Sequence, residues 1–210
     1  MLTKLKERVQ QLMVAEAKLA HSIGLAPNDV SIMGVFAAFI SAYLYWSSQF
    51  DYALLIAAAV LLLVSGFLDA LDGVLARVYG KSTLFGGFLD SLLDRYADSI
   101  VLMGIILGWL KEDTQIWLFV GLAALVGSLL VSYSRARSEA AGVKMETIGL
   151  AERAERIVII VIASFIAVVW RESLRWGIFL LAIITNLTVL QRSAYFRKAT
   201  QKKASEPQVS

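Results

Sequence analysis

The sequence predicts an all-α integral membrane protein that crosses the bilayer with six transmembrane helices. Of its 210 residues, 58% are hydrophobic and 18% are charged, whereas a soluble domain has about 45–50% apolar and roughly 25% charged residues. The apolar residues form stretches close to the roughly 20 residues that one helical span needs. The chain has no Cys and one His, which excludes disulfides, thiolate metal sites and a Cys nucleophile.

The predicted helices follow one another with short connections. Residues 1–20 place Leu2, Leu5 and Val9 at helical spacing with basic residues on other faces. We therefore expect an amphipathic helix that lies in the membrane interface or packs on protein. Residues 21–198 form the six-helix domain, and residues 199–210 are predicted to be a disordered tail. The six spans are expected at 31–48, 53–79, 85–110, 115–134, 157–170 (with a helix start near Glu152) and 174–191.

The distribution of Lys and Arg predicts the orientation of the chain. With the N-terminus inside the cell, 16 of the 20 basic residues fall in inner segments, three in outer turns, and Arg95 within a span. By the positive-inside rule, both termini are then cytoplasmic. This asymmetry also accounts for the basic balance of the chain, so the charge does not indicate a nucleic-acid partner.

Aspartates fall inside the second and third spans, where an acid at a helix centre costs roughly 2.5–3.5 kcal/mol on insertion. Asp69 and Asp72 are three residues apart, and Asp90 and Asp94 are four apart, so each pair shares one helix face. The short connection makes the two helices antiparallel neighbours, and the pairs can converge. Four converging carboxylates need cations between them, and oxygen ligands favour Mg²⁺, Mn²⁺ or Ca²⁺. The sequence therefore predicts a cluster of two divalent ions, with Asp98 as a supporting acid one turn further.

Small residues and an arginine accompany these acids. Gly73 and Ala76 follow Asp72, and Gly86 precedes Asp90 by four residues, which leaves room for a ligand to approach the backbone. Arg77 supplies a bidentate donor for phosphate. A metal site with these neighbours indicates a phosphate-bearing substrate.

The segment from Asp69 to Asp94 has the form DxxDGxxAR(x)8GxxxDxxxD, with all eight fixed positions filled. It resembles the signature of the CDP-alcohol phosphatidyltransferases. The resemblance implies a phospholipid-biosynthesis enzyme that transfers a phosphatidyl-type group from CDP-diacylglycerol or CDP-archaeol to an alcohol and releases CMP. It also implies two Mg²⁺ or Mn²⁺ ions, a homodimer, and a multi-pass protein of the cytoplasmic membrane whose active site faces the cytoplasm.

The same resemblance implies roles for individual residues. Asp69, Asp72 and Asp90 are expected to bind metal. Asp94 is expected to touch the second metal and to act as general base on the acceptor hydroxyl. Contacts to the CDP-lipid are expected from the signature and from the segment before the first span, in which Ser31 stands where the family more often has Thr. These residues are Asn28, Asp29, Val30, Ser31, Gly73, Ala76, Arg77, Thr83 and Gly86.

A second resemblance concerns the acceptor. Residues 132–142 and 149–156 resemble the subgroup that makes phosphatidylinositol phosphate, whose archaeal counterpart makes archaetidylinositol phosphate. A phosphorylated acceptor such as inositol phosphate needs a cationic pocket, although positive-inside topology alone would also place basic residues here. The candidate residues at the cytoplasmic ends of spans four and five are Arg135, Arg137, Arg153 and Arg156.

Three alternatives stay open at this point. The acceptor of the same reaction could instead be glycerol 3-phosphate or another alcohol. A cation or proton transporter would also use intramembrane acids, but it would spread them through the membrane rather than gather them near one side. In the third span, Gly104 and Gly108 form a GxxxG pattern, which favours close helix contact either within the chain or in a dimer.

Overall fold

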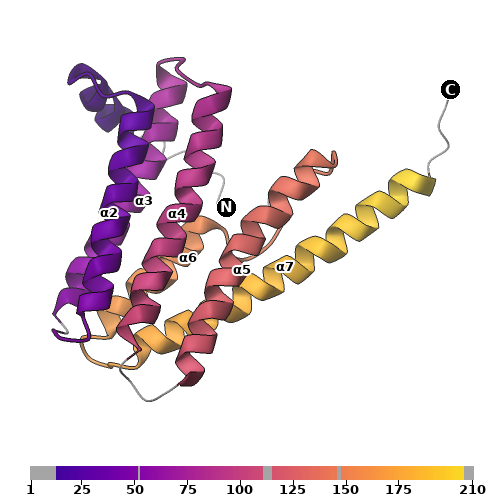
Figure 1. Ribbon diagram of the computed structural model, residues 1–210. Coiled ribbons are helices and arrows are strands. Elements are labelled where there is room, and N and C mark those ends of the chain that lie inside the picture. Colours follow the sequence, from indigo (N-terminus) through magenta and orange to yellow (C-terminus); the bar gives the residue numbers. More distant parts are fainter. Residues whose placement is uncertain (1–12, 52, 111–114, 146–147, 206–210) are drawn as a thin grey trace. The chain divides into compact units, whose positions relative to one another are not determined.

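The computed structural model describes residues 13–51, 53–110, 115–145 and 148–205, and these residues form helices joined by turns and irregular segments. Residues 13–22 are helical, and six longer helices follow. The all-α prediction is confirmed for these residues, and each predicted span overlaps one of the longer helices, although the ends differ. These are α2 (Pro27–Ser47), α3 (Leu54–Val78), α4 (Leu84–Gly108), α5 (Gln115–Ala140), α6 (Arg153–Ile166) and α7 (Ser173–Ser205), labelled in Figure 1.

Four of the described helices are long and apolar enough to cross a membrane: α2, α3, α5 and the Ser173–Gln201 part of α7. The other two differ from these for separate reasons. Helix α4 contains Asp90, Asp94, Arg95 and Asp98. Helix α6 has 14 residues, which at about 1.5 Å per residue reach roughly 21 Å, short of a hydrocarbon core of about 30 Å.

The chain divides into two compact units, Met1–Gly104 and Ile105–Ser210. In the first unit α2 and α3 lie side by side (Figure 1), and the Ser41 hydroxyl donates to the Ala58 carbonyl at 2.8 Å. Gly104 of α4 approaches α2 so closely that a Cβ there would lie 2.3 Å from the Ala42 carbonyl oxygen. Gly104 therefore serves a helix contact within the chain.

The helical residues 13–22 pack on protein. Met13, Ala17 and Ala20 are buried in one apolar cluster with residues of α2 and α3, and the His21 and Tyr79 rings stack with centroids 3.7 Å apart. Of the two interpretations of the N-terminal amphipathic segment, packing on protein holds for this part. Residues 1–12, which carry the other half of the predicted helix, lie outside the described residues. The partners in the cluster are Val30, Leu71, Val74 and Leu75.

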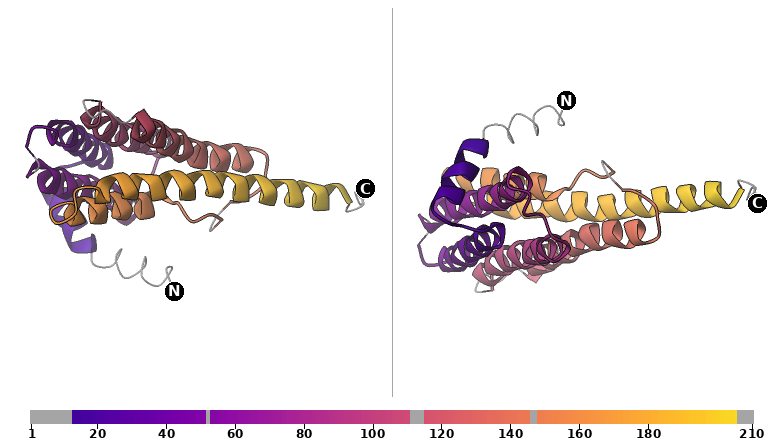
Figure 2. Two further views of the ribbon diagram at one scale, coloured as in Figure 1. Left: turned by 90° about the horizontal axis from the view of Figure 1, so that it is seen from below. Right: turned by 90° about the horizontal axis from the view of Figure 1, so that it is seen from above.

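In the second unit α5 and α7 lie side by side, as Figures 1 and 2 show. A Cβ on Gly127 of α5 would lie 2.3 Å from the Thr185 hydroxyl of α7, and the Asn186 amide donates to the Ala123 carbonyl at 3.2 Å. Helix α6 packs on α7 in the same manner, because a Cβ on Gly177 would lie 2.5 Å from the Ala163 Cβ. Small residues and polar contacts join these helices, as expected where lipid removes the hydrophobic drive between them.

Two helices extend past their predicted ends. Helix α5 continues to Ala140 rather than residue 134, and α7 is helical through Ser205, past the predicted start of the tail at residue 199. The apolar run ends at the first charged residues, but Arg, Lys, Gln and Ala are good helix formers and continue the helix into water. Residues 206–210 lie outside the described residues. Helix α6 starts at Arg153 after Glu152, as expected.

We expect Gly104→Ala to destabilise the protein by about 1–3 kcal/mol, because the new methyl group would meet the α2 backbone, which cannot rotate away. Thermal denaturation in detergent measures this as a lower Tm. The matched control is Gly87→Ala in the same helix, where a Cβ meets nothing within 4 Å and Ala is favoured over Gly by about 1 kcal/mol. Equal Tm values for Gly104→Ala and the unchanged protein would contradict the close α2–α4 contact.

Candidate functional site

Three aspartates from α3 and α4 gather in the first unit. Asp69, Asp72 and Asp90 each offer one carboxylate oxygen, and these atoms all lie within 4.8 Å of one another. Asp72 is 4% exposed, and the other two are half-buried. At this distance each ionised pair repels by about 3 kcal/mol at an effective dielectric constant near 20. A set of oxygen donors with this spacing suits a hard divalent cation, whose charge would offset the repulsion.

The start of α2 supports this cluster. The Ser31 hydroxyl donates to Asp72 Oδ2 and lies 3.1 Å from the Pro27 carbonyl oxygen. The Asp29 carboxylate accepts from the Ala26 backbone N–H at 2.9 Å, which caps the helix, and Val30 is buried in the apolar cluster. Three residues expected to contact the CDP-lipid therefore have structural partners here, and that expectation stays a prediction.

The remaining CDP-lipid candidates surround the α3–α4 connection. Thr83 Oγ1 accepts from the Gly86 backbone N–H at 2.9 Å, as an N-cap of α4 does. A Cβ on Gly86 would lie 3.0 Å from this hydroxyl and 3.5 Å from Asn28 Oδ1. Because Gly86 has no side chain, Asn28 and Thr83 can approach the same point.

Arg77 lies one turn after Gly73 on α3, and its side chain is exposed. A Cβ on Gly73 would lie 3.5 Å from a terminal nitrogen of the Arg77 guanidinium, so the arginine side chain lies next to Gly73. Ala76 is half-buried beside it. The guanidinium is thus exposed on the helix that supplies Asp69 and Asp72, where it can bind a phosphate.

Asp94 lies one turn beyond Asp90 on α4. Its Oδ2 is 3.6 Å from the Arg95 guanidinium, and Arg95 also donates to the Ser91 carbonyl. Arg95 therefore forms a structural ion pair with Asp94. Asp94 does not belong to the trio of carboxylates described above, and Asp98 is half-buried one turn further; their roles stay predictions.

The candidate acceptor arginines belong to the second unit. Arg135 Nε donates to Glu139 Oε1 at 2.9 Å, and Arg156, 5% exposed, donates to the Ala151 carbonyl at 2.8 Å. Arg137 is exposed and Arg153 is half-buried. The structure therefore anchors Arg156 to the segment before α6 and leaves Arg135 accessible.

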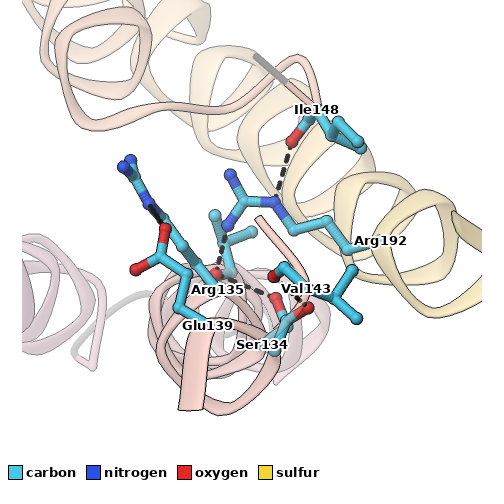
Figure 3. Close-up of polar contacts among 8 residues, drawn as sticks. Ser134, Arg135, Glu139, Val143, Ile148 and Arg192 are labelled. Carbon is cyan, nitrogen blue, oxygen red and sulfur yellow. Dashed lines mark hydrogen bonds and ion pairs between the residues drawn. The ribbon is translucent and has the colours of Figure 1, made fainter. Parts of the chain in front are cut away.

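A further arginine joins this group from α7. Arg192 is 2% exposed; its Nε donates to the Ile148 carbonyl at 2.8 Å, and its NH1 donates to the Val131 carbonyl. Figure 3 shows it between the residue 148 segment and the end of α5. The like charges of Arg135 and Arg156 repel its guanidinium. Sequence reasoning counted Arg192 only as a basic residue after a span, and nothing in the spacing distinguishes it from others of that kind.

The segment between α5 and α6 is docked on α7. Gly149 has φ +116°, a backbone conformation that favours glycine, and a Cβ there would lie 2.3 Å from Thr188 Cγ2. The Thr188 hydroxyl accepts from the Leu150 backbone N–H at 3.1 Å. These contacts hold the segment before α6 against Thr188 and Arg192 of α7.

Comparison with known proteins finds a family and relatives that match nearly the whole chain. Residues 25–190 match the family model of the CDP-alcohol phosphatidyltransferases. The chain is 42% identical to an archaetidylinositol phosphate synthase of Pyrococcus horikoshii over 193 residues, which cover 91% of this chain and 94% of that protein.

Solved structures of a related enzyme have a similar fold. A phosphatidylinositol phosphate synthase of Mycobacterium tuberculosis with CDP-DAG bound superimposes with a TM-score of 0.79 at 29% identity, covering 89% of this chain and 94% of that one. The same enzyme in complex with manganese and citrate also has a TM-score of 0.79 at 29% identity, with 88% of each chain covered.

We expect Asp90→Asn to have opposite effects on Tm with and without Mn²⁺. Without the cation, loss of one repelling charge should raise Tm. With Mn²⁺ at about 100 times its Kd, the unchanged protein should gain about 2.7 kcal/mol, whereas the variant should gain much less. Asp51→Asn, an exposed acid in the α2–α3 connection, is the control and should keep the full gain. Equal Mn²⁺ effects in all three proteins would exclude Asp90 as a ligand.

Proposed function

The chain belongs to the CDP-alcohol phosphatidyltransferase family, and on that premise we propose that it transfers a phosphatidyl-type group from a CDP-lipid to a hydroxyl of inositol phosphate. The lipid is CDP-diacylglycerol or CDP-archaeol, and CMP is released. The observation that carries the proposal is the gathering of Asp69, Asp72 and Asp90, each a fixed position of the signature. Similarity over 91% of the chain to an archaetidylinositol phosphate synthase supports the choice of acceptor.

The aspartates hold divalent cations, Mg²⁺ or Mn²⁺, and two ions fit the four acids of the signature. When bound, the cations supply positive charge that stabilises the pyrophosphate and the departing CMP. Asp69, Asp72 and Asp90 are the ligands supported by the described geometry. The exposed Arg77 guanidinium binds a phosphate of the CDP group, while Asn28, Thr83 and Gly86 line the approach at the α3–α4 connection.

The chemical step exchanges one phosphorus–oxygen bond for another. The acceptor hydroxyl oxygen bonds to the lipid-bearing phosphorus, and the bond from that phosphorus to the oxygen shared with CMP breaks. CMP leaves with the shared oxygen and its electron pair. The hydroxyl proton passes to the Asp94 carboxylate, one turn after Asp90 on α4, to which the resemblance to the family assigns the role of general base.

The acceptor phosphate binds to the basic cluster of the second unit. Arg135, Arg137, Arg153 and Arg156 are the candidates from the sequence. Arg192 is buried on backbone carbonyls, as Arg156 is, and adds positive charge to this cluster. A phosphomonoester carries close to two negative charges, which several guanidinium groups neutralise by charge-assisted hydrogen bonds. An unphosphorylated alcohol would not need such a cluster.

The membrane arrangement follows from the same premise. We infer that α4 and α6 also cross the membrane, which makes six spans with the four apolar helices, and that both termini are cytoplasmic. Residues 21–198 form the catalytic domain. The protein lies in the cytoplasmic membrane as a homodimer, and its acids and arginines open to the cytoplasm, where CDP-lipid headgroups and inositol phosphate meet.

The experiment that tests the reaction is a panel of acceptors with CMP release as the readout. Purified protein with CDP-diacylglycerol or CDP-archaeol and Mg²⁺ should release CMP with inositol 1-phosphate and much less with glycerol 3-phosphate, serine or free inositol. CMP release with glycerol 3-phosphate but not with inositol phosphate would contradict the proposed acceptor and leave the family reaction intact.

A second arm of the same assay tests the basic cluster. Arg135→Gln should raise KM for inositol phosphate by about tenfold or more, since a hydrogen bond between charged groups contributes about 1.5–3 kcal/mol. Arg175→Gln is the matched control, because Arg175 also pairs with a glutamate, Glu172, but stands at the start of α7. Unchanged KM in Arg135→Gln would remove Arg135 from the acceptor site.

We expect Asp94→Asn to lower kcat by about 100-fold or more, because an amide cannot accept the hydroxyl proton. CDP-lipid should still bind, which a CDP-lipid-dependent rise in Tm would measure. A variant with normal kcat would exclude Asp94 as the base, whereas loss of both turnover and CDP-lipid binding would assign it to binding instead.

A further inference from the structure

Ser31 lies where the start of α2 meets the metal-binding face of α3. We propose that Ser31 is a positioning residue for the metal site rather than a contact of the CDP-lipid: its hydroxyl holds the Asp72 carboxylate so that an oxygen stays directed towards Asp69 and Asp90. The inference rests on the proposed metal-dependent function. It concerns a link between α2 and the aspartate cluster. Ser31 lies outside the signature, which covers residues 69–94.

The hydrogen-bond inventory of Ser31 supports this role. A serine hydroxyl has one hydrogen to donate, and its acceptors in the structure are Asp72 Oδ2 and the Pro27 carbonyl oxygen. An ionised carboxylate is the stronger acceptor of the two. The side chain is 9% exposed, so a lipid phosphate could receive this hydrogen only if Asp72 lost it.

Asp72 is the carboxylate that most needs such a partner. It is the one buried member of the cluster at 4% exposure, and the Ser31 hydroxyl donates to its Oδ2. This donor orients the carboxylate against the repulsion of Asp69 and Asp90. Groups that orient a metal ligand in this way commonly change metal affinity by about 10–100-fold when they are removed.

The element that carries Ser31 is rigid at this position. Pro27 begins α2, the Asp29 carboxylate caps it by accepting from the Ala26 backbone, and Val30 is buried in the apolar cluster at 1% exposure. Ser31 thus approaches Asp72 from a fixed backbone. The same turn carries Asn28 towards Gly86 of α4, so the start of α2 meets both helices of the cluster.

The test measures Mn²⁺ affinity in purified protein without substrate, by calorimetry or by the spin-resonance signal of free Mn²⁺. Ser31→Ala should weaken binding about tenfold or more, while Ser31→Thr, which keeps the hydroxyl, should restore it. Ser31→Val provides the matched comparison with Ser31→Thr, since the two share shape and differ in the hydroxyl. In turnover assays, KM for CDP-lipid at saturating Mn²⁺ should stay unchanged in Ser31→Ala.

Ser41→Ala is the control for lost helix contacts. Ser41 is also buried in α2 and also bonds to α3, through the Ala58 carbonyl, but it stands away from the aspartates. It should lower Tm without changing Mn²⁺ affinity. If both Ser31→Ala and Ser41→Ala change affinity alike, Ser31 acts only through helix packing and the proposal is wrong.

The remaining outcomes separate this inference from the proposed function. If the unchanged protein binds Mn²⁺ and Ser31→Ala, Ser31→Val and Ser31→Thr all bind it equally well, the positioning role is wrong while the metal site stands. A raised KM for CDP-lipid with normal Mn²⁺ affinity would instead assign Ser31 to the substrate. Absence of Mn²⁺ binding in the unchanged protein would overturn the metal site itself, and this inference with it.

Discussion

Carboxylates that repel one another lie on two apolar helices of the first unit, and the packing of this unit has to hold them together. Carboxylate oxygens of Asp69, Asp72 and Asp90 lie within 4.8 Å of one another, and burial of Asp72 limits the screening of their charge by water. Such a cluster persists only if the helices that carry it cannot move apart and a cation balances the charge. The same repulsion favours binding of a divalent ion, whose charge offsets it.

The rigidity comes from helix contacts remote from the acids and from the first turn of α2. Gly104 lets α4 approach the backbone of α2, and Ser41 bonds α2 to α3. The first turn of α2 is held by its own cap through Asp29 and by burial of Val30. The resemblance to the family assigns residues 28–31 to CDP-lipid contacts. In the structure, Asp29, Val30 and Ser31 instead stabilise the site, and Asn28 is directed to the α3–α4 connection.

The second unit shows how similar basic residues acquire different tasks. The proposed topology puts Arg135, Arg156 and Arg192 on the same side of the membrane, but their surroundings differ. Arg156 and Arg192 are buried and bond to backbone carbonyls, which fixes the segment before α6 against α7. Arg135 is exposed and pairs with Glu139, so it can exchange that partner for a phosphate at low cost.

The sequence by itself determined the helical class, the approximate positions of the helices and the family, because apolar run length and the spacing of the signature are local properties. It also identified three acids that the structure brings together. Tertiary structure alone decided that Gly104 contacts α2, that residues 13–22 pack on protein, that Arg192 joins the basic cluster, and that Ser31 bonds to Asp72. Each of these joins residues far apart in the chain through the rotation and depth of packed helices, which no local pattern specifies. The extension of α7 to Ser205 has a different cause, since hydropathy marks where the membrane ends and not where helix propensity ends.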